Sequence, residues 1–250
     1  MSNMPMMRLD VRSNLSGIVR QLQGFQKEVA VATAKALTFT AEKVQRAQQQ
    51  KMTEVFDRPT KWTINGLRLK TASVHDLSAM VYFKDDATKG IPAGKYLLPQ
   101  INGGERRQKS SERRLAPFMG GMRYAIPAKS QPLDAYGNLS GAIYTRILAQ
   151  VGALNRYDNE TPASLKRNKK AQSERYFIPK AGSGLKPGVY KTVNGKPVMV
   201  LVFTAKASYK PRYPFYVFSE EVARQAFPLD YDQAIARELA KAFSSTPPIT

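Results

Sequence analysis

The chain has 250 residues, carries 39 Lys and Arg against 19 Asp and Glu for a formal net charge of +20, and contains no cysteine. That length is enough to bury a core in one large domain or two modest ones, and the absence of cysteine excludes disulfides, zinc–thiolate sites and thiol nucleophiles. Charge of this size favours a polyanionic or acidic partner over a merely soluble basic surface. No apolar run approaches the roughly 20 residues that cross a bilayer, and the Met-rich start lacks the pattern of a signal peptide, so we expect synthesis in the cytoplasm.

The first third of the chain predicts a strand, a long helix and a hairpin. Residues 8–12 alternate as a strand does. Apolar residues three and four apart then predict an amphipathic helix from Asn14 to Val55, ended by the turn before Pro59. Alternating residues at 67–72 and at 77–84 predict an antiparallel hairpin. The periodic helix positions are Leu15, Ile18, Leu22, Phe25, Val29, Ala32, Ala36, Phe39, Lys43 and Ala47.

The middle of the chain is rich in glycine, proline and basic residues. Residues 85–131 predict an irregular basic insertion with only short elements, such as turns of helix at 95–98 and 112–115. A second helix is predicted to start at 137–140, and residues 155–175 are predicted to form an exposed basic loop. The apolar face of the second helix comprises Leu139, Ile143, Ile147, Leu148 and Val151.

The last third predicts strands followed by helices. Residues 175–180, 188–193 and 196–205 read as strands, and Asn194-Gly195 is a two-residue hairpin signal. Helical segments at 217–227 and 229–243 are predicted to be separated at Pro228.

This order of elements predicts an α+β fold with a single domain over residues 1–250. A long N-terminal helix and C-terminal helices would pack on an antiparallel β-sheet, and extended basic loops would project from it.

The residues that commonly perform catalysis are scarce. His75 is the only histidine and lies in a predicted hairpin turn, so with no cysteine the common triads and zinc sites cannot be built. Acidic pairs could still hold Mg²⁺, but none has the spacing of a metal motif, and the adjacent residues Asp85 and Asp86 point opposite ways after a strand. We therefore expect no enzyme, no metal and no cofactor, with a Mg²⁺-dependent nuclease using Asp85 or Asp86 as the least favoured alternative. The other acidic candidates are Asp134, Asp158, Glu160, Glu220, Glu221, Asp230 and Asp232.

Two basic clusters are candidate contact sites for DNA or an acidic partner. Such glycine-flanked stretches contact phosphates without reading base sequence, and no recognition-helix or zinc-finger pattern is present. A solvated face and a contact with an acidic neighbouring subunit are the competing interpretations. The first cluster comprises Arg106, Arg107, Lys109, Arg113 and Arg114, and the second comprises Lys166, Arg167, Lys169 and Lys170.

Several short blocks, in the same order along the chain, resemble the minor tail protein Z and tail-completion proteins of long-tailed phages and prophages. The most specific block runs from Lys95 to Arg106 and contains Tyr-Leu-Leu-Pro-Gln followed by Gly-Gly-Glu-Arg. The resemblance extends from Phe56 to the C-terminal helices. The other blocks are Phe56–Asn65, Tyr82–Asp86, Leu133–Ser140, Arg175–Phe177, Gly188–Tyr190 and Tyr209–Phe215.

The resemblance implies a structural virion protein that is not a catalyst. Such a protein completes the tail at its head-proximal end and helps to join the tail to the head, as a homo-oligomeric ring present in few copies. The implied partners are tail terminator, tail tube or head–tail connector proteins, with genome DNA in the channel and no membrane. A nonspecific DNA-binding or packaging-associated phage protein is the alternative.

Overall fold

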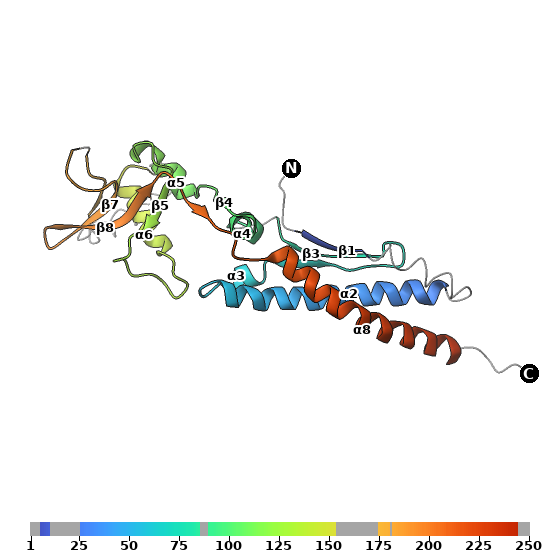
Figure 1. Cartoon of the computed structure of the whole chain (residues 1–250). Coiled ribbons are helices and arrows are strands. Elements are labelled where there is room, and N and C mark those ends of the chain that lie inside the picture. Colours follow the sequence, from blue (N-terminus) through green and yellow to red (C-terminus); the bar gives the residue numbers. More distant parts are fainter. Residues whose placement is uncertain (1–5, 11–25, 86–89, 154–174, 181, 245–250) are drawn as a thin grey trace, which may run out of the picture. The chain divides into compact units, whose positions relative to one another are not determined.

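The computed structural model describes residues 6–10, 26–85, 90–153, 175–180 and 182–244 (Figure 1). The chain forms two compact units: unit 1 comprises Met1–Gly103 and Lys210–Thr250, and unit 2 comprises Gly104–Tyr209. Unit 2 is therefore inserted, in sequence, between two segments of unit 1. The sequence predicted one domain interrupted by an irregular insertion at 85–131. The inserted unit is longer than that, and it contains regular helices and strands of its own. The predicted loop at 155–175 lies outside the described residues except for Arg175.

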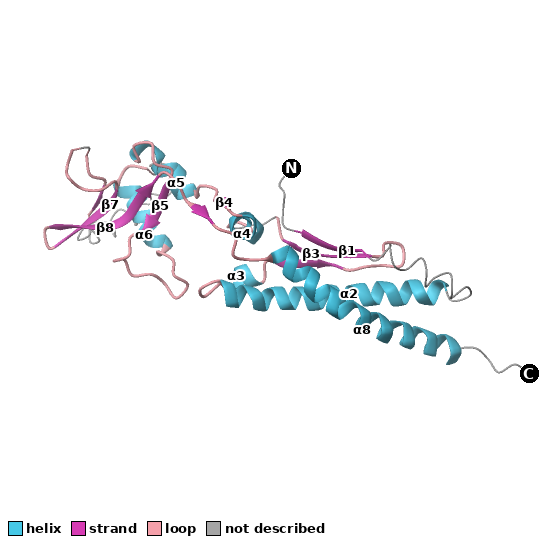
Figure 2. Cartoon of the chain, viewed as in Figure 1, coloured by secondary structure: helices cyan, strands magenta, loops and turns pink. Residues whose placement is uncertain are grey.

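Unit 1 combines two long helices with a three-stranded antiparallel sheet of order β1-β3-β2 (Figure 2). The two helices lie side by side, and the sheet packs on the first of them. This arrangement confirms the predicted α+β class, and the pairing of Leu67 with Phe83 confirms the predicted hairpin. The elements of unit 1 are β1 (Met6–Asp10), α2 (Gln26–Val55), α3 (Lys61–Ile64), β2 (Leu67–Lys70), β3 (Ser78–Phe83), α4 (Ala93–Asn102) and α8 (Phe215–Ser244).

The inward face of α2 agrees with the prediction at Val29, Ala32 and Ala36, which are buried, and departs from it farther along the helix. The helix ends at Val55 as predicted, while residues 14–25 of the predicted helix lie outside the described residues. Phe39 is 41% exposed, although the apolar pattern placed it inside. The positions that turn inward instead include two polar residues, Thr40 and Gln48, which are both fully buried. A pattern based on apolar residues cannot follow a helix face that contains hydrogen-bonded polar side chains.

The predicted break at Pro228 is wrong, because α8 continues through it. Proline removes one backbone donor and crowds the preceding turn, so contacts on both sides of it must hold the helix together. Before it, Phe227 packs against the core. After it, the buried carboxylate of Asp230 accepts from Thr40 Oγ1 at 2.9 Å and from Lys43 Nζ at 2.5 Å, both on α2. Packing against α2 thus overrides the local preference of proline.

Unit 2 contains a four-stranded antiparallel sheet of order β5-β8-β7-β6 and a separate two-stranded ribbon of order β4-β9. Its core includes Leu115, Ile147, Leu201 and Phe203. Asn194 and Gly195 both have positive φ, at 49° and 76°, which confirms the predicted two-residue hairpin turn. The elements of unit 2 are β4 (Gly104–Glu105), α5 (Ser110–Leu115), the 3-10 helix η1 (Ala116–Phe118), β5 (Tyr124–Pro127), α6 (Gly141–Gln150), β6 (Tyr176–Phe177), β7 (Gly188–Val193), β8 (Lys196–Thr204) and β9 (Ser208–Tyr209).

The start of α6 shows how local sequence sets a boundary in unit 2. Asp134 Oδ1 accepts the backbone N–H groups of Tyr136 and Asn138, both at 2.9 Å, and Gly137 has a φ of 76°. Ser140 then caps the helix by accepting the N–H of Ile143. Turn chemistry of this kind is readable from sequence. Among the helices of the described ranges, none is long and apolar enough to cross a lipid bilayer.

Candidate functional site

The first basic cluster divides into an inward part and an outward part. Arg106 belongs to the inward part, with a side chain that is 14% exposed. Its guanidinium binds both carboxylate oxygens of Glu112, with Nη1 at 2.7 Å from Oε2 and Nη2 in a short contact with Oε1. Because a two-pronged pair of this kind uses the fork of the arginine, Arg106 serves the interior of unit 2 and is not available to an outside partner.

Glu112 is the centre of this inward part, and its side chain is only 1% exposed. Besides Arg106, its carboxylate accepts the backbone N–H of Lys109 at 2.7 Å and that of Ala125 at 3.0 Å. Burial alone would raise the pKa of Glu112, but the hydrogen bonds from Arg106 and from the two backbone groups outweigh burial and lower the pKa. The carboxylate therefore joins the start of α5 to the start of β5.

Tyr124 extends the same cluster. Its ring is buried, the guanidinium of Arg106 lies 4.8 Å from the ring centroid, and the guanidinium of Arg123 lies 5.6 Å from it. The Tyr124 hydroxyl donates to Arg106 O at 3.0 Å and to Glu105 Oε2 at 3.2 Å, and Glu105 also pairs with Arg123 at 3.3 Å. Two arginines of unit 2 are thus matched by two glutamates around one aromatic ring.

The outward part consists of Arg107, Arg113 and Arg114, all with exposed side chains. On α5, Glu112 and Leu115 face the interior, so the two arginines between them face outward. None of these three arginines forms an ion pair with a carboxylate of the described residues. The Lys109 side chain is exposed as well, although partial desolvation and repulsion by Arg106 lower the pKa of its ammonium, against the opposing effect of Glu112. The second predicted cluster, Lys166, Arg167, Lys169 and Lys170, lies outside the described residues.

The residues considered for metal binding are separated or already engaged. Within the described residues, no group of three or more His, Asp or Glu side chains is arranged to hold a metal ion. His75 is exposed in its turn, as predicted. Asp85 is exposed and lies 3.7 Å from Lys95 Nζ, whereas Asp86 lies outside the described residues. Asp230 is taken up by the contacts that fasten α8 to α2.

A network in unit 1 joins residues from three of the motif blocks. Gln100 Oε1 accepts Arg212 Nε at 2.7 Å, and the Gln100 carbonyl accepts the backbone N–H groups of Arg212 and Tyr213, both at 2.9 Å. The Arg212 guanidinium lies 5.0 Å from the centroid of the Phe56 ring, which meets the Tyr213 ring edge-on at 5.5 Å. We call Phe56, Gln100, Arg212 and Tyr213 the motif node. Within unit 1, the motif node joins the chain segment just before the inserted unit 2, which ends at Gly103, to the segment just after it, which begins at Lys210.

Gln48 of α2 connects the motif node to the interior of unit 1. Its Oε1 accepts the Tyr213 hydroxyl at 2.5 Å, while its Nε2 donates to Phe215 O at 2.8 Å and to Ser219 Oγ at 2.6 Å. Burial raises the pKa of Tyr213 far above its ordinary value, so the hydroxyl stays protonated and keeps donating. Both the oxygen and the nitrogen of the buried Gln48 amide therefore have hydrogen-bond partners within unit 1.

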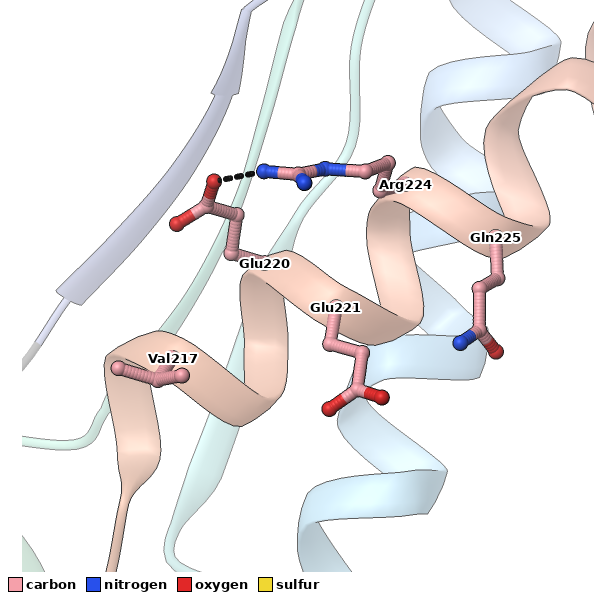
Figure 3. A pocket seen from close by; sticks show the side chains of 5 residues that line it. All are labelled: Val217, Glu220, Glu221, Arg224 and Gln225. Atoms are coloured by element: carbon pink, nitrogen blue, oxygen red, sulfur yellow. Dashed lines mark hydrogen bonds and ion pairs between the residues drawn. The ribbon is translucent and has the colours of Figure 1, made fainter.

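A shallow hollow on α8 brings no catalytic groups together. It is lined by Val217, Glu220, Glu221, Arg224 and Gln225, which all belong to the same helix (Figure 3). Glu220 and Arg224 reach toward each other and form an ion pair at 2.5 Å, while Glu221 and Gln225 lie apart from them. A site for a small substrate normally draws polar groups from several elements into one concave pocket, and this hollow does not.

The inward role of Arg106 and Glu112 and the polar core around Gln48 were missed from sequence. A signal was present for the first of these, because Glu112 lies six residues after Arg106 in an otherwise basic stretch. The sequence gives no such signal for Gln48, because it belongs to a polar stretch that contains other glutamines, such as Gln45 and Gln49.

The lowered pKa of Glu112 predicts an acid-dependent loss of stability in unit 2. A carboxylate with a lower pKa in the folded state stabilises the fold fully above the pKa of the unfolded chain, about 4.3 for glutamate, and this contribution is lost as the pH falls through the lower folded value. Urea unfolding measured from pH 7 to pH 3 should therefore show the stability difference between wild type and Glu112→Gln shrinking below about pH 4. A difference that stays constant across that range would contradict the assigned role of the carboxylate.

Comparisons with known proteins found no match. No protein-family model, no curated protein and no solved structure matches this chain.

Proposed function

We propose that this protein is a non-enzymatic structural component of a tailed-phage virion, which completes the tail at its head-proximal end and helps to join tail to head. The observation that carries the proposal is the motif node. Phe56, Gln100, Arg212 and Tyr213 come from three separate blocks of the resemblance to tail-completion proteins, and they contact one another in unit 1. A shared physical role is what one expects of blocks that belong to one family pattern.

The chemistry of the motif node supports a scaffold function. The amide of Gln100, the guanidinium of Arg212 and the hydroxyl of Tyr213 are all engaged with other groups of unit 1. Groups that bind substrate or transfer protons need a free position directed toward a cleft. The node instead fixes the two chain segments that flank the inserted unit 2.

The same proposal includes the oligomeric state and the neighbours that the resemblance implies. Several copies would form a ring around the tail channel and contact tail terminator, tail tube or head–tail connector proteins. Ring formation requires a heterologous contact whose rotation closes. Genome DNA in the lumen would be compatible with the net charge of +20.

The test is a nonsense mutation in the gene for this chain, in a phage or prophage that encodes it, with the wild-type gene supplied from a plasmid as control. We expect the protein in purified intact particles, and we expect the mutant to accumulate filled heads and unjoined tails. Restoration of joined particles by the plasmid completes the expected result. Infectious particles that lack this chain would overturn the proposal.

Two alternative functions predict different experimental results. A free DNA-binding or packaging-associated protein, which the basic charge also supports, would be absent from purified wild-type particles. The nonsense mutant would then accumulate empty heads. A nuclease using Asp85 or Asp86 would nick plasmid DNA in the presence of Mg²⁺ and not in EDTA. The ion pair of Asp85 with Lys95 gives no support to that third function.

A further inference from the structure

The positive charge of the chain is concentrated in unit 2. Residues 104–209 contain 19 Lys and Arg against 6 Asp and Glu, a net charge of +13, whereas the longer remainder of the chain contains 20 against 13, a net charge of +7. The positive excess of unit 2 is therefore almost twice that of unit 1, although unit 2 is the shorter of the two. An excess concentrated in one folded unit indicates where a polyanion would be bound.

The described acidic residues of unit 2 do not offset the charges of Arg107, Arg113 and Arg114. The structure describes three of them, and each has an internal role: Glu105 pairs with Arg123, Glu112 is buried against Arg106, and Asp134 accepts two backbone N–H groups in its turn. These three carboxylates are thus already taken up by contacts within the unit. Within the described residues, they leave Arg107, Arg113 and Arg114 without an ion-pair partner.

The fold holds these three arginines on one short stretch with a fixed backbone. Glu112 and Leu115 anchor α5 from the inside, and Arg106 is held by Glu112 immediately before Arg107. The backbone that bears Arg107, Arg113 and Arg114 is consequently attached to the core on both sides. We call these three residues the outward arginines. A phosphate contact made from an ordered backbone costs less conformational entropy than one made from a free chain.

We infer that unit 2 binds the phosphate backbone of duplex DNA without base-sequence preference, through the outward arginines. Guanidinium groups match phosphate oxygens in a two-pronged geometry, and a unit with a net charge of +13 suits a uniformly charged rod. A contact surface for an acidic protein would be expected to have an apolar centre depleted of charge, whereas this stretch is formed by exposed charges. The inference goes beyond the proposed place in the virion and does not depend on it.

The experiment measures binding of the full-length protein to a fluorescein-labelled 24-base-pair duplex of arbitrary sequence by anisotropy, between 50 and 200 mM NaCl. We expect binding that weakens linearly on a log–log plot as salt rises, with equal affinity for a second duplex of scrambled sequence. Each phosphate contact contributes about 0.9 to the slope. The variant Arg107→Gln/Arg113→Gln/Arg114→Gln should therefore lose about 2 to 3 units of slope and bind roughly 10- to 100-fold more weakly at 100 mM salt.

A matched control variant removes the same charge from unit 1. Lys27, Lys61 and Arg237 are exposed there, and the substitutions Lys27→Gln/Lys61→Gln/Arg237→Gln lower the net charge by the same three units. This control should keep the wild-type slope, and thermal unfolding should show both variants folded. No duplex binding by wild type at 50 mM salt, or equal losses in the two variants, would overturn the inference. Retention on poly-glutamate together with failure to bind the duplex would overturn it in favour of an acidic protein partner.

Discussion

Replacing Glu112 by alanine is expected to lower the free energy of unfolding of unit 2 by about 3–5 kcal/mol, the range found when one partner of a buried ion pair is removed. The substitution leaves the guanidinium of Arg106 largely buried without its counter-charge, and it also removes the acceptor for the N–H groups of Lys109 and Ala125. Hydrogen exchange followed by mass spectrometry can locate the effect. Protection of β8, in the core of the same unit, should fall by about 150- to 5000-fold, since 1.36 kcal/mol corresponds to a factor of ten.

Two controls separate the buried pair from charge removal in general. Glu54 is exposed and pairs with Lys51 at 2.9 Å, so Glu54→Ala should change stability by no more than about 0.5 kcal/mol. The double variant Arg106→Met/Glu112→Leu replaces both charges with apolar groups and should recover much of the loss, because no unpaired buried charge remains. A double variant as unstable as Glu112→Ala would contradict this explanation.

The consequence for the basic cluster is that neighbours of the same residue type have different roles. Arg106 and Arg107 are adjacent and chemically identical, yet one is a structural residue and the other is exposed. Net charge therefore overstates the surface available to a partner. In this cluster the exposed charge is that of the outward arginines and Lys109, and any count of phosphate contacts should start from them.

The parts of the fold that were predicted correctly depend on local chemistry. The hairpin at Asn194-Gly195 follows from the positive φ that both residues tolerate, and the start of α6 follows from the Asp134 turn and the Ser140 cap. The end of α2 at Val55 similarly reflects the turn before Pro59. In each case the deciding interaction lies within a few residues along the chain.

The parts that were mispredicted depend on contacts distant in sequence. The helix α8 survives Pro228 because Asp230 pairs with Lys43, which is 187 residues away. Arg106 turns inward because it pairs with Glu112, and Glu112 is itself held in place by the backbone N–H of Ala125, 13 residues farther along the chain. The extent of the inserted unit depends on the pairing of β4 with β9, which only the folded chain reveals. No local pattern encodes such pairings.

Gln48 offers the strongest test of the polar core in unit 1. The variant Gln48→Leu keeps a similar volume but removes the amide that binds the Phe215 carbonyl and Ser219 Oγ, and it leaves the Tyr213 hydroxyl only a 3.5 Å contact to the carbonyl of residue 48. Because each buried group left unpaired costs about 1–3 kcal/mol, we expect the free energy of unfolding to fall by about 3–5 kcal/mol. Urea unfolding can be followed by the fluorescence of Trp62, which is the single tryptophan and lies in unit 1.

The stability loss of Gln48→Leu should depend on whether the Tyr213 hydroxyl is present. In Gln48→Leu/Tyr213→Phe the hydroxyl is removed together with its acceptor, so the double variant should be more stable than the sum of the single losses predicts. Gln50 is exposed on the same helix, and Gln50→Leu should change stability by no more than about 0.5 kcal/mol. If Gln48→Leu were as stable as wild type, the buried amide would be replaceable by packing alone. The contact of its ring with Phe56 and its backbone bond to Gln100 would then hold Tyr213 in the motif node, and this hydrogen bond would not be needed.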